Sequence, residues 1–165
     1  MKKFLLLMSL CLPVFTFASS NNETQEKEES EGIVNPDYLT GEWWLVKLRV
    51  REKIDGKVVN DSVGNFPYKK ELDSSEKHRF TLNKRMVFTD ECLTYDSIFK
   101  KWNTLFSNRV FLKKNDNKIY LSEYDDFREK ILKLDSDELI IEGTDFEGVY
   151  HYVKIFKRVR KHMVC

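Results

Sequence analysis

The sequence contains little of what phosphate-binding and metal sites are built from. Its 165 residues include only six glycines, three cysteines and three histidines. The glycines are scattered singly, so there is no glycine-rich loop to cradle phosphate, and nucleotide binding is not expected. His78, His151 and His162 are widely separated, and neither His-Glu-x-x-His nor Cys-x-x-Cys occurs. The sequence therefore predicts no metal site and no cofactor.

Motifs for catalysis are absent as well. There is no Gly-x-Ser-x-Gly elbow or comparable nucleophile signature. The acidic clusters at 125–126 and 135–138 lie where turns are expected, and turns favour aspartate. The formal net charge of +1 gives no reason to expect nucleic acid or another polyanion as a partner. We expect a protein that is not an enzyme and has no catalytic residue.

A long apolar run stands at the N-terminus, from Phe4 to Phe17. It follows Lys2 and Lys3 and ends at Thr16-Phe17-Ala18, which is the three-part layout of a secretory signal peptide. At about fourteen residues it is short for a transmembrane helix, which needs about twenty. We expect residues 1–18 to be removed on export, which leaves a periplasmic or extracellular protein without a transmembrane segment.

Cys11 leaves a membrane lipoprotein as the alternative, because lipoprotein signals are cut just before a cysteine that then receives lipid. The residue before it, Leu10, is not the usual small one, and the chain after it stays apolar. Cleavage after Ala18 is therefore favoured.

The mature chain divides into a linker and one domain. Residues 19–37 are acidic and contain almost no large apolar side chain, which is typical of a disordered linker. Residues 38–165 are long enough for one domain with a real core. In an oxidising compartment Cys92 and Cys165 can form a disulfide; alternatively, Cys92 is an inert thiol in a strand and Cys165 is unpaired.

Alternation of apolar and polar residues dominates the domain. A period of two over 44–51 predicts a strand, and the Asp-Gly pair at 55–56 predicts a tight turn into a second strand at 57–59. Residues 60–77 are polar and irregular and predict a long loop or lid. Further strands are expected at 80–82, 86–88 (after a turn at Asn83-Lys84), 109–112, 119–121, 127–134, 139–142 and 149–159.

Residues 92–107 fit two patterns. Ile98, Trp102 and Leu105 have helical spacing, whereas alternate residues from Leu93 to Phe99 could line a strand. We favour a short helix from about Asp96, whose side chain would cap the first turn. About eight short strands with at most one helix predict an all-β, mainly antiparallel fold: an up-and-down barrel or a strongly bent sandwich.

The domain resembles the bacterial lipocalin-like domains of exported proteins. The resemblance lies in Gly41-Glu42-Trp43 at the first strand and in the final strands at 131–134, 139–142 and 150–159. It extends over most of residues 39–159. It implies a small eight-stranded lipocalin-like β-barrel whose narrow interior holds one small ligand.

Several side chains are candidate ligand contacts. The aromatic candidates are Trp44, Tyr95, Phe99, Trp102, Tyr150 and Tyr152, although aromatic residues also build ordinary cores. His151 shares strand parity with Val149, Val153 and Ile155, so we expect it to point into the barrel. There it would orient a ligand or bond to a backbone carbonyl.

Two functions fit this sequence. The leading hypothesis is an exported module that binds a small apolar or amphipathic molecule in the barrel. The alternative is a non-catalytic protein-interaction or structural module of the cell envelope, with a barrel filled by side chains. Fold alone does not decide between them, but the lining of the barrel interior can.

Overall fold

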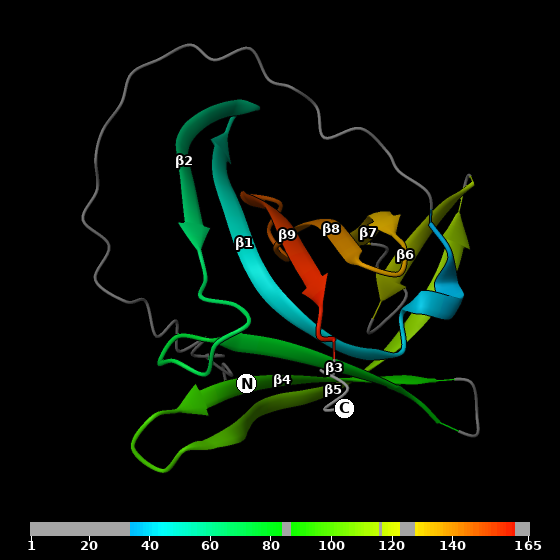
Figure 1. Cartoon of the computed structure of the whole chain (residues 1–165). Helices are drawn as coiled ribbons and strands as arrows, with labels where there is room; N and C mark the ends of the chain where they lie inside the picture. The colour runs from blue at the N-terminus through cyan, green and yellow to red at the C-terminus, as the bar shows by residue number, and fades with distance from the viewer. Residues whose placement is uncertain (1–33, 84–86, 116, 123–127, 161–165) are drawn as a thin grey trace, which may run out of the picture.

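The computed structural model describes residues 34–83, 87–115, 117–122 and 128–160. They form one 3-10 helical turn, η1 (Pro36–Tyr38), and nine strands (Figure 1). The strands are β1 (Gly41–Ile54), β2 (Lys57–Asn65), β3 (Glu76–Leu82), β4 (Phe88–Asp96), β5 (Lys101–Asn115), β6 (Lys118–Ser122), β7 (Glu129–Leu134), β8 (Glu138–Thr144) and β9 (Tyr150–Arg158). The predictions for residues 1–33 and for Lys84, Met86, Asp116, Asp125, Asp126, Phe127, His162 and Cys165 lie outside the described residues.

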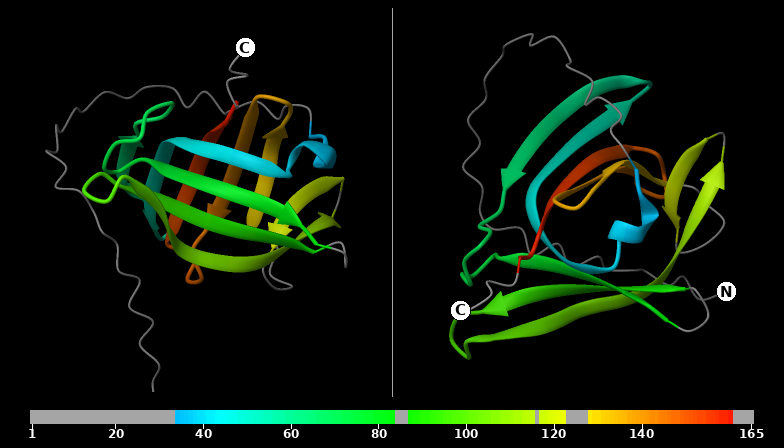
Figure 2. Two further views of the ribbon diagram at one scale, coloured as in Figure 1. Left: turned by 60° about the horizontal axis from the view of Figure 1, so that its bottom comes forward. Right: turned by 45° about the vertical axis from the view of Figure 1, so that its right-hand side comes forward.

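Eight of the strands close into an antiparallel barrel. Each strand from β3 to β8 pairs with the next one along the chain, and β1 closes the ring by pairing with both β3 and β9. The extra strand, β2, pairs with the second half of β1 and extends away from the ring (Figure 2). The expected all-β, antiparallel, up-and-down barrel is therefore confirmed.

The hairpin between β1 and β2 turns where the Asp-Gly pair predicts. Asp55 and Gly56 both have positive φ values, 50° and 74°, which a two-residue hairpin turn requires. The following strand runs on to Asn65, however, so the expectation of a loop beginning at residue 60 is wrong. Arg49 on β1 holds the polar part of β2 in register through its Nε, 2.9 Å from Asp61 Oδ1.

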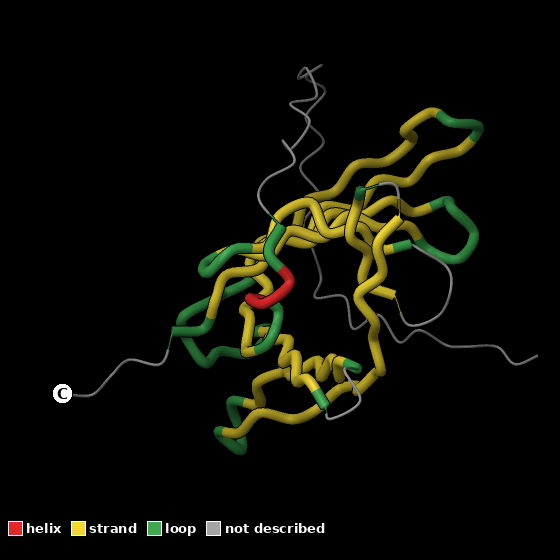
Figure 3. The backbone as a smooth tube through the Cα atoms, turned by 90° about the vertical axis from the view of Figure 1, so that its right-hand side faces the viewer, coloured by secondary structure: helices red, strands yellow, loops and turns green. Residues whose placement is uncertain are grey.

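The helix expected from about Asp96 is also wrong. Asp96 does cap a turn, since its Oδ1 accepts hydrogen bonds from the backbone amides of Ile98 (3.0 Å) and Phe99 (2.9 Å). The turn ends at Lys100, whose φ of 49° is left-handed. The chain then returns as β5. Residues 101–110 of β5 pair with the whole of β4. This long-range pairing overrides the helical spacing; Figure 3 shows η1 as the helix of the described chain.

One end of the barrel is sealed by apolar side chains. Trp43 is completely buried there, and its indole Nε1 donates a hydrogen bond to the backbone carbonyl of Leu39 (2.9 Å). The guanidinium of Arg158 lies 4.5 Å from the centre of the Trp43 ring and donates to the backbone carbonyl of Thr40 (2.8 Å). The buried cluster comprises Leu39, Trp43, Leu45, Phe80, Phe88, Val110, Leu121, Ile131, Leu134, Leu139, Ile141 and Phe156.

Residues before the expected domain boundary at residue 38 pair with the barrel. Val34 forms a parallel bridge with Leu134, and the amide of Asn35 donates to the Leu134 carbonyl (2.9 Å). η1 then leads the chain across the sealed end. The last residues assigned to the linker thus belong to the fold. None of the helical segments within the described ranges is long and apolar enough to cross a membrane.

Candidate ligand-binding site

The inward faces of the strands change character along the barrel. On each strand, the residue two positions beyond a buried apolar side chain points to the same side of the sheet. Moving away from the sealed end, Phe80 is followed by His78, Phe88 by Asp90 and Phe156 by Lys154. We call the resulting set the polar half of the interior: Glu76, His78, Asp90, Cys92, Glu129, Tyr152 and Lys154.

His78 is a buried member of this set, with 5% of its surface exposed. Its ring Nδ1 lies 2.9 Å from Asp90 Oδ1, and its Nε2 lies 3.2 Å from Glu76 Oε1. Burial alone would lower the pKa of His78, but hydrogen bonds to Asp90, Cys92 and Glu76 more than offset it and raise the pKa well above its usual value. The ring therefore lies between two carboxylates, each within hydrogen-bonding distance of one of its nitrogens.

A second charged group lies on β7 and β9. Glu129 Oε1 accepts hydrogen bonds from Lys154 Nζ and from the Tyr152 hydroxyl, both at 2.8 Å. Burial opposes both charges, but their mutual attraction prevails. It lowers the pKa of Glu129 and raises the pKa of Lys154. Both groups are therefore charged at neutral pH.

The polar half is not sealed as the apolar half is. The side chains of Glu76 and Glu129 each keep 25% of their surface exposed, and Lys154 keeps 29%. The centre of the Phe106 ring lies 6.0 Å from that of the His78 ring, and Phe106 is 41% exposed. Charged side chains and Phe106 in this part of the barrel are thus partly exposed to solvent.

A third cluster lies on the outer face of the barrel. Lys77 alternates with His78 and points outward, where its Nζ is 4.5 Å from the centre of the Trp44 ring and 3.9 Å from that of Trp102. Tyr95 packs against Trp102 at 5.3 Å between centroids, and the Trp102 indole donates to Glu71 Oε1 (3.1 Å). This cluster covers the sheet from outside and does not line the interior.

The structure separates the aromatic residues expected to contact a ligand. Trp44, Tyr95 and Trp102 come together, but in the outer cluster. Phe99 is in the turn between β4 and β5 with 70% of its surface exposed, and Tyr150 at the start of β9 is 45% exposed. Of the six, Tyr152 joins the polar half.

The inward direction expected for His151 is wrong. Tyr152 and Lys154 bind Glu129, and Phe156 belongs to the core, so these residues form the inner face of β9. His151 lies on the opposite face. β9 pairs with both β1 and β8, so its basic residues do not lie on an edge strand of the sheet.

The residues of the polar half match no sequence motif, although the alternation of residues along the strands indicates them. Glu76 and His78 share the parity of Phe80, and Asp90 and Cys92 share that of Phe88. Polar residues on an apolar strand face indicate a buried polar group that needs partners. No spacing motif captures them, because His78 and Cys92 meet only through the pairing of β3 with β4.

Cys92 itself is a buried thiol beside His78. Burial raises the pKa of this thiol, and the neighbouring His78 only partly counteracts that effect. Its expected disulfide partner, Cys165, lies outside the described residues, so that pairing stays a prediction.

A pocket of about 260 Å³ lies between β6, β7 and Val34. It is lined by Val34, Asn117, Lys118, Ile119, Lys130, Ile131 and Leu132. None of the residues of the polar half lines it. We therefore take the inward charged residues as the candidate site.

Gly143 makes room for the Tyr152 ring. A Cβ atom at position 143 would lie 2.6 Å from the ring carbon Cζ of Tyr152 and 2.6 Å from its hydroxyl oxygen. Replacing Gly143 by alanine should displace the hydroxyl from Glu129 and lower the free energy of unfolding by about 2 kcal/mol, as overpacking does. Urea denaturation measures this value.

The matched control for Gly143→Ala is the same substitution in a Tyr152→Ala background. There the added methyl group has space, so its cost should fall below about 0.5 kcal/mol. An equal cost in both backgrounds would show that Tyr152 does not occupy this position.

Comparison with known proteins does not assign this chain to a family. No protein-family model matches the sequence, and no curated protein matches it. The siderocalin Ex-FABP, described as functioning through dual ligand specificities, is 15% identical over 76% of this chain and 76% of that chain, with a TM-score of 0.43. Per a 4, a major cockroach allergen, is 12% identical over 83% of this chain and 76% of that chain, with a TM-score of 0.46. At these values the likeness does not extend to a ligand or a role.

Proposed function

We propose that this protein is an exported binding module that holds one small amphipathic molecule in the polar half of its barrel. The observation that carries the proposal is the partly exposed set of charged side chains on the inner face of the barrel. A barrel that serves only as a scaffold gains nothing from burying charge, because desolvation is costly and apolar residues of the same size would be as stable.

The two halves of the interior suit the two parts of an amphipathic ligand. Phe106 and the nearby apolar core offer contact to a hydrocarbon or ring system. Lys154, Tyr152 and Glu129 offer both donors and acceptors to a polar group. Binding sites of this kind combine mainly apolar walls with a few placed polar groups.

The apolar half of the interior supports the competing function of a filled, non-catalytic interaction module. Trp43, Phe80 and Phe156 are almost completely buried there and fill the barrel's width. This filling limits the ligand to the polar half and therefore to a small size. It does not explain the charges beyond it.

Export and the absence of catalysis are parts of the same proposal. The lysines, apolar run and Ala18 exit at the N-terminus support cleavage and release into the periplasm or the extracellular space. No catalytic motif supports an enzymatic role. N-terminal sequencing of the protein recovered from its host tests the export step: the mature chain should begin at Ser19.

Native mass spectrometry of the protein purified from its own host tests ligand binding. We expect a mass above that of the mature chain, and release of a single small molecule on denaturation. A chain that carries no added mass and takes up no molecule from a host lipid and metabolite extract would exclude this function.

Two lysines on one strand provide a matched comparison. Lys154 points into the barrel, whereas Lys157 points outward to Glu138, 2.5 Å from its Oε1. Lys154→Gln should weaken binding of the recovered molecule about tenfold or more, since hydrogen bonds to charged groups are worth about 1.5–3 kcal/mol. Lys157→Gln should leave the affinity unchanged. Equal effects of the two variants would place the ligand elsewhere.

A further inference from the structure

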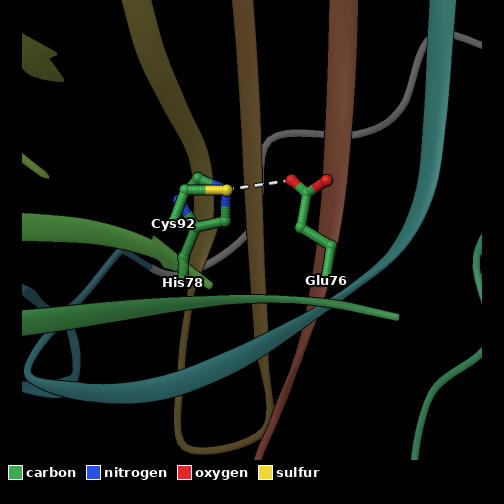
Figure 4. Close-up of side chains that lie close together, drawn as sticks. All are labelled: Glu76, His78 and Cys92. Carbon is green, nitrogen blue, oxygen red and sulfur yellow. Dashed lines mark hydrogen bonds and ion pairs between the residues drawn. The ribbon is translucent and has the colours of Figure 1, made fainter. Parts of the chain in front are cut away.

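Three metal-ligating side chains converge inside the barrel. The donor atoms of Glu76, His78 and Cys92 all lie within 4.8 Å of one another, and the three side chains come from the paired strands β3 and β4 (Figure 4). We propose that Glu76, His78 and Cys92 form a binding site for a divalent transition metal of the zinc class. The site lies within the polar half, but the metal proposal does not rest on the amphipathic ligand proposed above.

The donor separations suit a tetrahedral ion. Zinc binds nitrogen, oxygen and sulfur ligands at about 2.0–2.3 Å, which places neighbouring ligand atoms about 3.4 Å apart in a tetrahedron. His78 Nε2 and Glu76 Oε1 are already 3.2 Å apart. Cys92 Sγ lies within 4.8 Å of the other two donor atoms. A small rotation of the Cys92 side chain therefore brings the sulfur to the tetrahedral separation.

A second observation is the hydrogen bond on the far side of the His78 ring. Asp90 accepts from Nδ1 at 2.9 Å, which directs the Nε2 atom toward Glu76 and Cys92. Metal-ligating histidines are held in this way by a carboxylate on the other ring nitrogen, which fixes the ring orientation and increases the basicity of the donor. Asp90 is thus a positioning residue.

The donor types indicate the class of metal. A thiolate and an imidazole favour zinc, cobalt or copper over magnesium and calcium, which prefer oxygen ligands alone. Three protein ligands leave one tetrahedral position open, as in catalytic rather than structural zinc sites.

Cobalt(II) is the probe for this site, because a cobalt–thiolate bond absorbs in the near ultraviolet and tetrahedral cobalt absorbs strongly in the visible. Adding cobalt chloride to the reduced, metal-free mature protein should produce both bands with one equivalent bound. One equivalent of zinc chloride should remove both bands. A folded protein that shows neither band at millimolar cobalt would overturn the proposal.

Substitutions identify the ligands. Cys92→Ser should abolish the ultraviolet band, whereas Cys165→Ser, which removes a cysteine remote in sequence, should retain it. Glu76→Gln and Asp90→Asn should each lower the cobalt affinity about tenfold to a hundredfold. Circular dichroism establishes that each variant is folded. Persistence of the band in Cys92→Ser, or its loss in Cys165→Ser, would show that another thiol binds the metal.

Discussion

Replacing Trp43 by alanine should lower the free energy of unfolding by about 4 kcal/mol, the range found when a buried tryptophan is truncated. Trp43 is fully buried at the sealed end of the barrel. Its removal leaves a large cavity and frees the Leu39 carbonyl that accepts its indole hydrogen bond. Arg158 loses the ring on which its guanidinium lies. Urea denaturation followed by far-ultraviolet circular dichroism measures the change.

Two further variants separate the contributions at Trp43. Trp43→Phe retains most of the apolar volume and should cost about 1–2 kcal/mol, because it mainly removes the buried hydrogen bond. Trp102→Ala removes an indole from the outer cluster, which is partly exposed, and should cost less than half as much as Trp43→Ala. If the two alanine variants were equally unstable, the sealed end would not be the principal core.

Replacing Lys154 by methionine should destabilise the protein by about 3 kcal/mol at pH 7, because it leaves Glu129 charged without its partner in the barrel. Lys154 is the main charge that keeps the pKa of Glu129 low. Lys157→Met removes a lysine of the same strand from an outer pair with Glu138 and should cost less than 1 kcal/mol.

The loss in Lys154→Met should depend on pH. In the native protein the pKa of Glu129 lies below its unfolded value of about 4.5, so its contribution is present above that pH and lost as the pH falls through the folded pKa. In the variant, burial without Lys154 raises the pKa of Glu129. The difference between the two proteins should therefore be largest near neutrality and shrink below pH 4. A difference independent of pH would mean that Lys154 acts through packing alone.

The class of fold could be predicted because its signals are local. Alternating side chains and turn residues such as Asp55-Gly56 specify hairpins one at a time, and a chain of hairpins closes into a barrel. The helix at 96–106 could not be excluded in this way. Asp96 caps a turn in either structure, and only pairing of β4 with β5 decides between them.

The candidate site depends on information that local patterns do not contain. Both faces of β9 carry apolar residues, so its alternation permits either Tyr152 or His151 to point inward. Tyr152 and Lys154 point inward because both bind Glu129 on β7. Likewise, His78 and Cys92 lie opposite each other only in the observed register of β3 and β4. Contacts between strands, more than the strands themselves, create the polar half.

A crystal structure of the protein purified from its own host would test most directly whether the polar half of the barrel is a binding site. We predict density for a small molecule within hydrogen-bonding distance of Tyr152, Glu129 or Lys154, with its apolar part directed toward Phe106. An interior in which these side chains pack against one another and leave no space, in protein never exposed to denaturant, would contradict the proposed function.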